Sequence, residues 1–101
     1  MRTHADLQKI LTQLEVLLPE LSARYKVASL GVFGSFVRQE QHPGSDLDLL
    51  VTFRETPSLF TFIALENYLS DNLGEKVDLV MESALKPAVG KQILTEVIRV
   101  E

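Results

Sequence analysis

Three short apolar runs do most to limit how this chain of 101 residues can fold. They extend over residues 27–33, 46–53 and 76–81 and are rich in Val, Leu and Phe, which indicates buried strands. A shorter run at residues 97–100 predicts a last edge strand. Because helical stretches separate these runs, the sequence predicts an α/β (α+β) fold. We expect a small mixed sheet of three to four strands with helices packed on one face.

A helix is predicted ahead of the first strand, because apolar residues recur there at helical spacing. Thr3 is a suitable N-cap for this helix, with Asp6 at its third position. Pro19 falls inside the stretch, so it either kinks the helix or begins a short second one. The apolar stripe consists of Leu7, Ile10, Leu11, Leu14, Leu17, Leu18 and Leu21. Further helices are expected at residues 36–41, at residues 58–72 between Ser58 and Gly74, and at residues 84–96.

Composition and charge exclude several classes of protein. With 46% apolar residues the chain can form a core, and its length fits a single domain over residues 1–101. The sequence lacks cysteine, which excludes disulfides and thiolate metal sites and suits the cytoplasm. No apolar run approaches the ~20 residues that span a bilayer, and no signal peptide is recognisable, so we expect no membrane association. A net charge of −4 argues against a nucleic-acid partner.

Two aspartates stand at the start of the second predicted strand. Side chains alternate along a strand, so Asp46 and Asp48 are expected on the same face. Two neighbouring carboxylates repel each other unless a cation lies between them. Ligands that are all oxygen suit Mg²⁺ or Mn²⁺. The alternative is a pair of hydrated aspartates with no ligand.

The third predicted strand contains one acidic residue, Asp78, among apolar neighbours. A polar residue inside a buried strand usually has a partner. If the second and third strands are adjacent, Asp78 becomes the third member of a carboxylate cluster. Taken by itself, a solvent-facing aspartate is an equally good interpretation.

The dipeptide Gly34-Ser35 marks the turn from the first strand into a helix. A glycine there lets a ligand approach the backbone, and the first turn of a helix offers free N–H groups that suit phosphate. Ser35 adds a hydroxyl, and Arg38 follows one turn later, placed to reach a phosphate oxygen. The alternative is an ordinary turn with a surface arginine.

The spacing of these residues is stronger evidence for a functional site than any one residue taken by itself. Ten residues separate Ser35 from Asp46, so the pattern is Gly-Ser, ten residues, Asp-x-Asp. Given the Gly-Ser pair, two aspartates at fixed offsets occur by chance only roughly a few times per thousand. The pattern also falls in a consistent context of strand, helix, loop and strand.

These segments resemble the DNA polymerase β nucleotidyltransferase superfamily. The similar residues are Gly34-Ser35-Phe36-Val37-Arg38, the stretch from Ser45 to Val51, and Lys76-Val77-Asp78-Leu79-Val80. Within it the chain is most similar to the minimal nucleotidyltransferase (MNT) proteins of bacteria and archaea, in their MntA-like antitoxin branch. The resemblance covers nearly the whole chain and implies the nucleotidyltransferase fold.

The resemblance also implies roles for the residues of the motif. Asp46 and Asp48 would hold two metal ions, and Asp78 would join one of them and help activate the attacking hydroxyl. Gly34 and Ser35 would bind the triphosphate, with Arg38 assisting. ATP would be the substrate and Mg²⁺ the cofactor, with Mn²⁺ as an alternative. Two metal ions about 4 Å apart suit an in-line displacement that releases pyrophosphate.

The resemblance further implies a partner. MNT proteins pair with HEPN-domain proteins, often as the antitoxin of a toxin–antitoxin pair, and transfer AMP to the toxin. Two other functions stay open: a catalytically silent module that neutralises its partner by contact, and a nucleic-acid adaptor, which the acidic charge disfavours. Homo-oligomerisation is also left open. Candidate apolar docking surfaces are Leu59, Phe60, Phe62 and Ile63, and the C-terminal Val97, Ile98 and Val100, unless these belong to the core.

Overall fold

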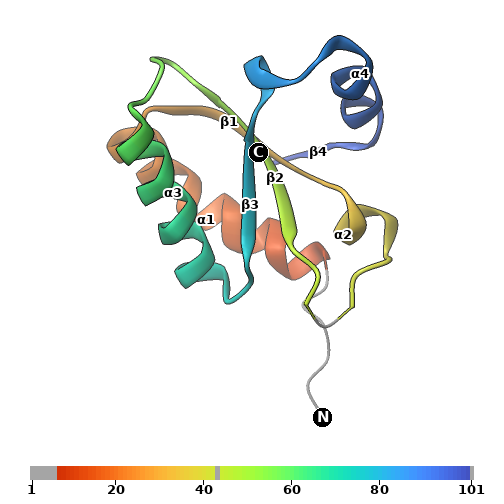
Figure 1. Cartoon of the computed structure of the whole chain (residues 1–101). Coiled ribbons are helices and arrows are strands. Elements are labelled where there is room, and N and C mark those ends of the chain that lie inside the picture. Colours follow the sequence, from red (N-terminus) through yellow and green to blue (C-terminus); the bar gives the residue numbers. More distant parts are fainter. Residues whose placement is uncertain (1–6, 43, 101) are drawn as a thin grey trace.

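The computed structural model describes residues 7–42 and 44–100. Within them the chain forms a mixed four-stranded sheet, as predicted from the sequence (Figure 1). The order of its strands is β3-β2-β1-β4. The β1 strand is antiparallel to both β2 and β4, whereas β2 and β3 are parallel. The strands are β1 (Val27–Phe33), β2 (Leu47–Phe53), β3 (Val77–Met81) and β4 (Ile98–Arg99).

Two long helices, α1 (Leu7–Tyr25) and α3 (Leu59–Leu73), cover one face of the sheet (Figure 1). Their apolar side chains form the core together with alternate strand residues, because neighbouring strand residues point to opposite faces. This confirms the prediction of helices on one face. The fully buried residues of the core are Ile10, Leu14 and Leu21 from α1, Leu65 and Leu69 from α3, and Leu30, Val32, Leu47 and Leu49 from the sheet.

The remaining helical elements are short. The α2 helix (Ser35–Arg38) follows β1 directly and ends where Gln39 takes a left-handed conformation, so it is shorter than the predicted 36–41. A 3-10 turn, η1 (Glu82–Ala84), precedes α4 (Pro87–Glu96), so the predicted C-terminal helix begins later than residue 84. The α4 helix lies apart from α1 and α3 (Figure 1).

Pro19 neither ends α1 nor begins a second helix, because α1 is continuous through it. A proline removes one backbone N–H from a helix and leaves the carbonyl four residues earlier without its usual donor. Pro19 is exposed, so water can satisfy that carbonyl. The predicted cap formed by Thr3 and Asp6 lies outside the described residues.

The predicted caps of α3 are confirmed. The Ser58 hydroxyl accepts a hydrogen bond from the Thr61 N–H at 3.1 Å, and Gly74 ends the helix with a φ of 69°.

All helices in the described part of the chain are too short or too polar to cross a lipid bilayer.

Candidate active site

Asp48 lies in the middle of the sheet, between β1 and β3. It pairs in register with Phe33 on one side and with Asp78 on the other. Its neighbours Leu47 and Leu49 point into the core, so the Asp48 side chain projects from the opposite face, away from α1 and α3. The same alternation applies on β3, where Asp78 lies between two buried residues. The parallel pairing therefore places Asp48 and Asp78 side by side on the open face of the sheet.

The surroundings of Asp48 raise its pKa to about 6. Partial burial contributes most, because it removes water from the charged carboxylate. The negative charges of Asp78 and Asp46 and a hydrogen bond with Asp78 raise the pKa further. Asp46, just before the first residue of β2, is thus close enough to interact with Asp48 electrostatically. The structure brings together all three predicted carboxylates.

The three carboxylates do not by themselves form a complete set of metal ligands. Within residues 7–42 and 44–100, no group of three or more acidic, histidine or cysteine side chains is arranged to hold a metal ion. The donors nevertheless suit a hard divalent cation, since they are all carboxylate oxygens that repel one another. Mg²⁺ commonly takes only one or two protein carboxylates and completes its shell with water and substrate phosphates.

Gly34 packs against the Asp48 carboxylate. Its φ is +79°, a conformation that other residues rarely adopt. A Cβ atom at this position would lie 2.1 Å from Asp48 Oδ2, which is far inside van der Waals contact. The sequence predicted that this glycine makes room for a ligand. The structure adds that it makes room for the protein's own carboxylate.

Ser35 is the first residue of α2 and is half-buried. The Gly34 carbonyl accepts hydrogen bonds from the Val37 N–H at 3.1 Å and the Arg38 N–H at 3.2 Å, which fixes the turn between β1 and α2. The N–H groups at the start of a helix lack intrahelical acceptors. The turn that begins at Gly34, next to the Asp48 carboxylate, therefore offers hydrogen-bond donors for a ligand, and Ser35 belongs to the same turn.

Arg38 is held by two glutamates. Its Nε donates to Glu40 at 2.8 Å, and its Nη1 donates to both carboxylate oxygens of Glu96 at 3.0 and 3.1 Å. These hydrogen bonds raise the pKa of the guanidinium. The positive charge of Arg38 also reaches Asp48, whose pKa it lowers slightly against the larger opposing effects. Glu96 was not predicted to lie here: it is 58 positions from Arg38 in the chain, and its ion pair with Arg38 joins α4 to α2.

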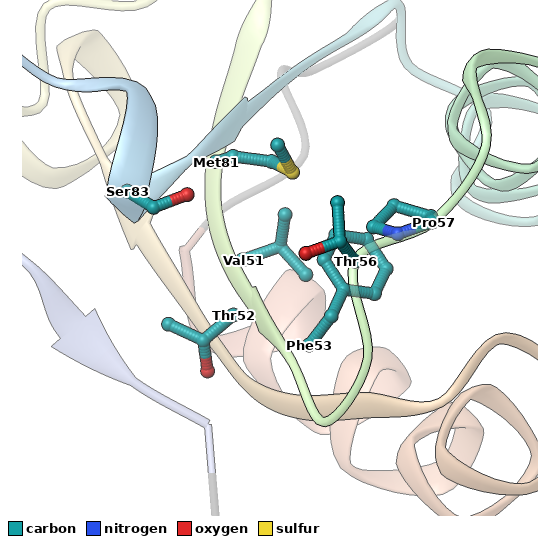
Figure 2. A pocket seen from close by; sticks show the side chains of 7 residues that line it. All are labelled: Val51, Thr52, Phe53, Thr56, Pro57, Met81 and Ser83. Atoms are coloured by element: carbon teal, nitrogen blue, oxygen red, sulfur yellow. The ribbon is translucent and has the colours of Figure 1, made fainter.

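Two pockets in the described part of the chain are lined by residues other than the three carboxylates. One of about 210 Å³ is found at the C-terminal ends of β2 and β3, where Figure 2 shows Phe53, Thr56 and Pro57 on one side and Ser83 on the other. A more apolar one of about 500 Å³ lies beside the start of α3 and is lined by Leu59, Phe62, Leu79 and Met81 among others.

Comparisons with known proteins agree with this arrangement. The sequence profile of the nucleotidyltransferase domain family matches residues 14–100, a range that includes every site residue described above. The protein adenylyltransferase MntA of Thermococcus cleftensis is 48% identical over 99% of this chain and 98% of its own length. A solved structure named as a minimal nucleotidyltransferase is 39% identical, with a TM-score of 0.79 over 96% of this chain and 98% of its own. A crystal structure of a toxin–antitoxin with AMP-PNP is 25% identical, with a TM-score of 0.71 over 86% of this chain and 72% of its own.

Proposed function

The chain belongs to the nucleotidyltransferase domain family, among the MntA-type minimal nucleotidyltransferases, and from this premise we propose that it transfers AMP from ATP to a HEPN-domain partner protein. In this proposal residues 1–101 act as one catalytic domain in the cytoplasm, and the protein is the antitoxin of a HEPN/MNT toxin–antitoxin pair. The observation that carries the proposal is the contact of three elements at one point: the Gly34 turn, Asp48 on β2 and Asp78 on β3.

Asp46 and Asp48 would hold Mg²⁺, with Asp78 joining one of two ions. Bound there, Mg²⁺ would neutralise the charge that develops on the phosphates during transfer. The raised pKa of Asp48 supports this assignment in part: burial contributes most to it, and the remainder comes from the neighbouring charges of Asp78 and Asp46, whose repulsion a divalent cation would relieve. Gly34 and Ser35 would contact the triphosphate, and Arg38 would assist.

The proposed reaction is an in-line displacement at the α-phosphorus of ATP. A hydroxyl oxygen of the partner forms a bond to this phosphorus while the bond to the bridging oxygen of pyrophosphate breaks. The hydroxyl proton passes to the Asp78 carboxylate, and pyrophosphate leaves with the electron pair of the broken bond. The partner would present a Tyr, Ser or Thr on a mobile segment, so that the hydroxyl can reach Asp78.

A protein acceptor is supported by the relatives and by the surface of the molecule. The relatives described above include a protein adenylyltransferase and a toxin–antitoxin solved with AMP-PNP. The start of α3 exposes Leu59, Phe60 and Ile63, as predicted for a docking surface, whereas Phe62 packs against the core. The other candidate surface is less suitable, because Val100 is buried. The net charge of −4 disfavours a nucleic-acid acceptor.

The proposal can be tested by incubating the protein with its HEPN-domain partner, Mg²⁺ and labelled ATP, followed by mass spectrometry of the partner. We expect AMP on the partner with the wild type and a loss of at least ~10²-fold in rate with Asp46→Asn, since a metal ligand is removed. Asp71→Asn is the matched control, because Asp71 is an exposed acidic residue on α3, which covers the face of the sheet opposite to the carboxylates.

Two results would contradict the proposed enzymatic function. Transfer at the same rate by Asp46→Asn would exclude the carboxylate site as the place of catalysis. Neutralisation of the partner without any gain of AMP, unchanged in Asp46→Asn, would instead support the silent binding module. The exposed Leu59, Phe60 and Ile63 side chains would then be the functional surface.

A further inference from the structure

The outer edge of β3 is bonded to side chains of α3. Among the described residues, β3 is an edge strand of the sheet, with β2 as its neighbour. On its free side, the Val77 N–H donates to Ser70 Oγ at 3.0 Å, and the Leu79 N–H donates to Glu66 Oε2 at 2.9 Å. Glu66 and Ser70 are four residues apart, so they lie on the same face of α3.

These two N–H groups would otherwise lack acceptors. Val77 and Leu79 are buried, with exposed fractions of 4% and 5%. A buried backbone N–H without a partner is rare in folded proteins and destabilising. A carboxylate also makes a stronger acceptor than a neutral group. Glu66 and Ser70 therefore take the place of a missing neighbour strand.

Asp78 lies between the two bonded positions. β2 holds its backbone on one side, and the bonds to Ser70 and Glu66 hold the flanking residues on the other. We propose that Glu66 and Ser70 are positioning residues of the transfer site, which keep β3 in place so that the Asp78 carboxylate stays against Asp48. The inference rests on the proposed function, in which Asp78 accepts the proton of the attacking hydroxyl.

The expected effect is on the chemical step and not on ATP binding. Gly34, Ser35, Asp46 and Asp48 belong to β1, α2 and β2 or lie next to them, and neither Glu66 nor Ser70 bonds to these elements in the described part of the chain. Loosening β3 would displace Asp78 and leave the triphosphate contacts intact. Small displacements of a catalytic group are known to lower rates by up to ~10².

The test compares Glu66→Ala, Glu66→Gln and Ser70→Ala at a temperature at which circular dichroism shows all of them folded. AMP transfer to the partner gives kcat and the KM for ATP, each with saturating Mg²⁺. For Glu66→Ala we expect kcat to fall ~10-fold and the KM for ATP to stay within ~2-fold of the wild type. Glu66→Gln should recover most of kcat, because its amide oxygen can still accept from Leu79. Asn67→Ala is the control, since Asn67 is its exposed neighbour on α3.

Several outcomes would overturn the inference. Wild-type kcat in both Glu66→Ala and Ser70→Ala would do so if Asp78→Asn is inactive in the same assay. A Gln variant as slow as the Ala variant, or an equal loss in Asn67→Ala, would also contradict it. If Glu66→Ala does not fold, Ser70→Ala decides, because it removes a single hydroxyl.

If the wild type transfers AMP and Asp78→Asn does so equally well, the role proposed for Asp78 fails, and the positioning role fails with it. If the wild type transfers no AMP, the proposed function fails first.

Discussion

Among single residues, Gly34 is one at which an added side chain has no room. A side chain there would meet Asp48 Oδ2, and the backbone conformation itself is strained for any other residue. We therefore expect Gly34→Ala to lower nucleotide transfer by at least ~10² and to destabilise the fold by about 1–3 kcal/mol. Enzyme kinetics and urea unfolding measure the two effects.

Gly74→Ala is the matched control for this prediction. Gly74 also has a positive φ, of +69°, but a Cβ atom there would meet nothing within 4 Å. This variant should lose some stability and keep its activity. Comparable loss of activity in both variants would show that backbone strain, and not the Asp48 contact, explains the effect.

The pKa of Asp48 predicts how stability depends on pH. Its value of about 6 is above the ordinary 3.8, so between these two pH values the folded protein binds more protons than the unfolded chain. The resulting stabilisation is complete below pH ~4 and is lost as the pH rises through ~6. Without Mg²⁺, we expect the contribution of Asp48 to the free energy of unfolding to fall by about 1 kcal/mol from pH 4 to 7, after allowance for solvent screening.

Comparison with Asp48→Asn isolates this effect. The difference in unfolding free energy between the wild type and the variant should change with pH in the stated direction, because groups that do not interact with Asp48 titrate equally in both proteins and cancel. The difference therefore reports Asp48 together with its coupling to Asp46 and Asp78. A difference that stays constant from pH 4 to 7 would show that Asp48 has an ordinary pKa. Urea unfolding at four or five pH values is sufficient.

The sequence indicated the principal site residues because their signals are local. Asp46 and Asp48 share a face by strand alternation, and an acid inside an apolar strand pointed to Asp78. The contacts between elements carried no such signal. Nothing near Gly34 in the sequence shows that Asp48 packs on it, and nothing near Arg38 shows that Glu96 binds it.

Among the elements, the C-terminal end of α1 is stabilised by the side chain of Arg54, which directly follows β2. The Arg54 guanidinium donates to the Ser22 carbonyl at 2.7 Å and to the Ser22 hydroxyl at 2.6 Å, and its backbone N–H donates to the Lys26 carbonyl at 2.8 Å. A cation is favourable at a helix C-terminus, where carbonyls lack partners. Arg54→Ala should therefore cost about 1 kcal/mol and lower Tm by about 4–8 °C.

Arg54→Lys separates charge from geometry. Lysine keeps the positive charge but lacks the planar fork that reaches two acceptors at once. We expect it to restore less than half of the lost stability, as measured by thermal unfolding. Complete restoration would mean that charge near the helix end is sufficient and that the individual hydrogen bonds contribute little.

The boundaries of elements were predictable where a cap marks them. Ser58 and Gly74 gave α3 almost to the residue, because their conformations and hydrogen bonds are local. The extents of α2 and β4 were less accessible: α2 is four residues long and β4 only two. Whether so short an element forms depends on the residues that pack beside it in the folded protein, and these contacts cannot be read from the local sequence.

For the whole molecule, the distribution of aromatic side chains was only partly predictable. We expected Phe60 either in the core or on a docking surface, and it is 85% exposed, whereas Phe36, which follows the Gly34-Ser35 turn, is buried. Hydrophobicity by itself cannot distinguish a core position from an interface position. The orientation of the first turns of α3 determines which is which, because Phe60 and Ile63 are exposed there while Phe62 packs against the core.

The closed edge of β3 has a consequence for how the molecule can associate. An unpaired strand edge is a template on which another chain can add its own strand, in a partner or in an aggregate. Here one edge already donates its N–H groups to α3, and the opposite edge is a strand of two residues. Association through an added strand is thus disfavoured at both ends of the sheet. We therefore expect a partner to dock on side-chain surfaces, such as the exposed first turn of α3.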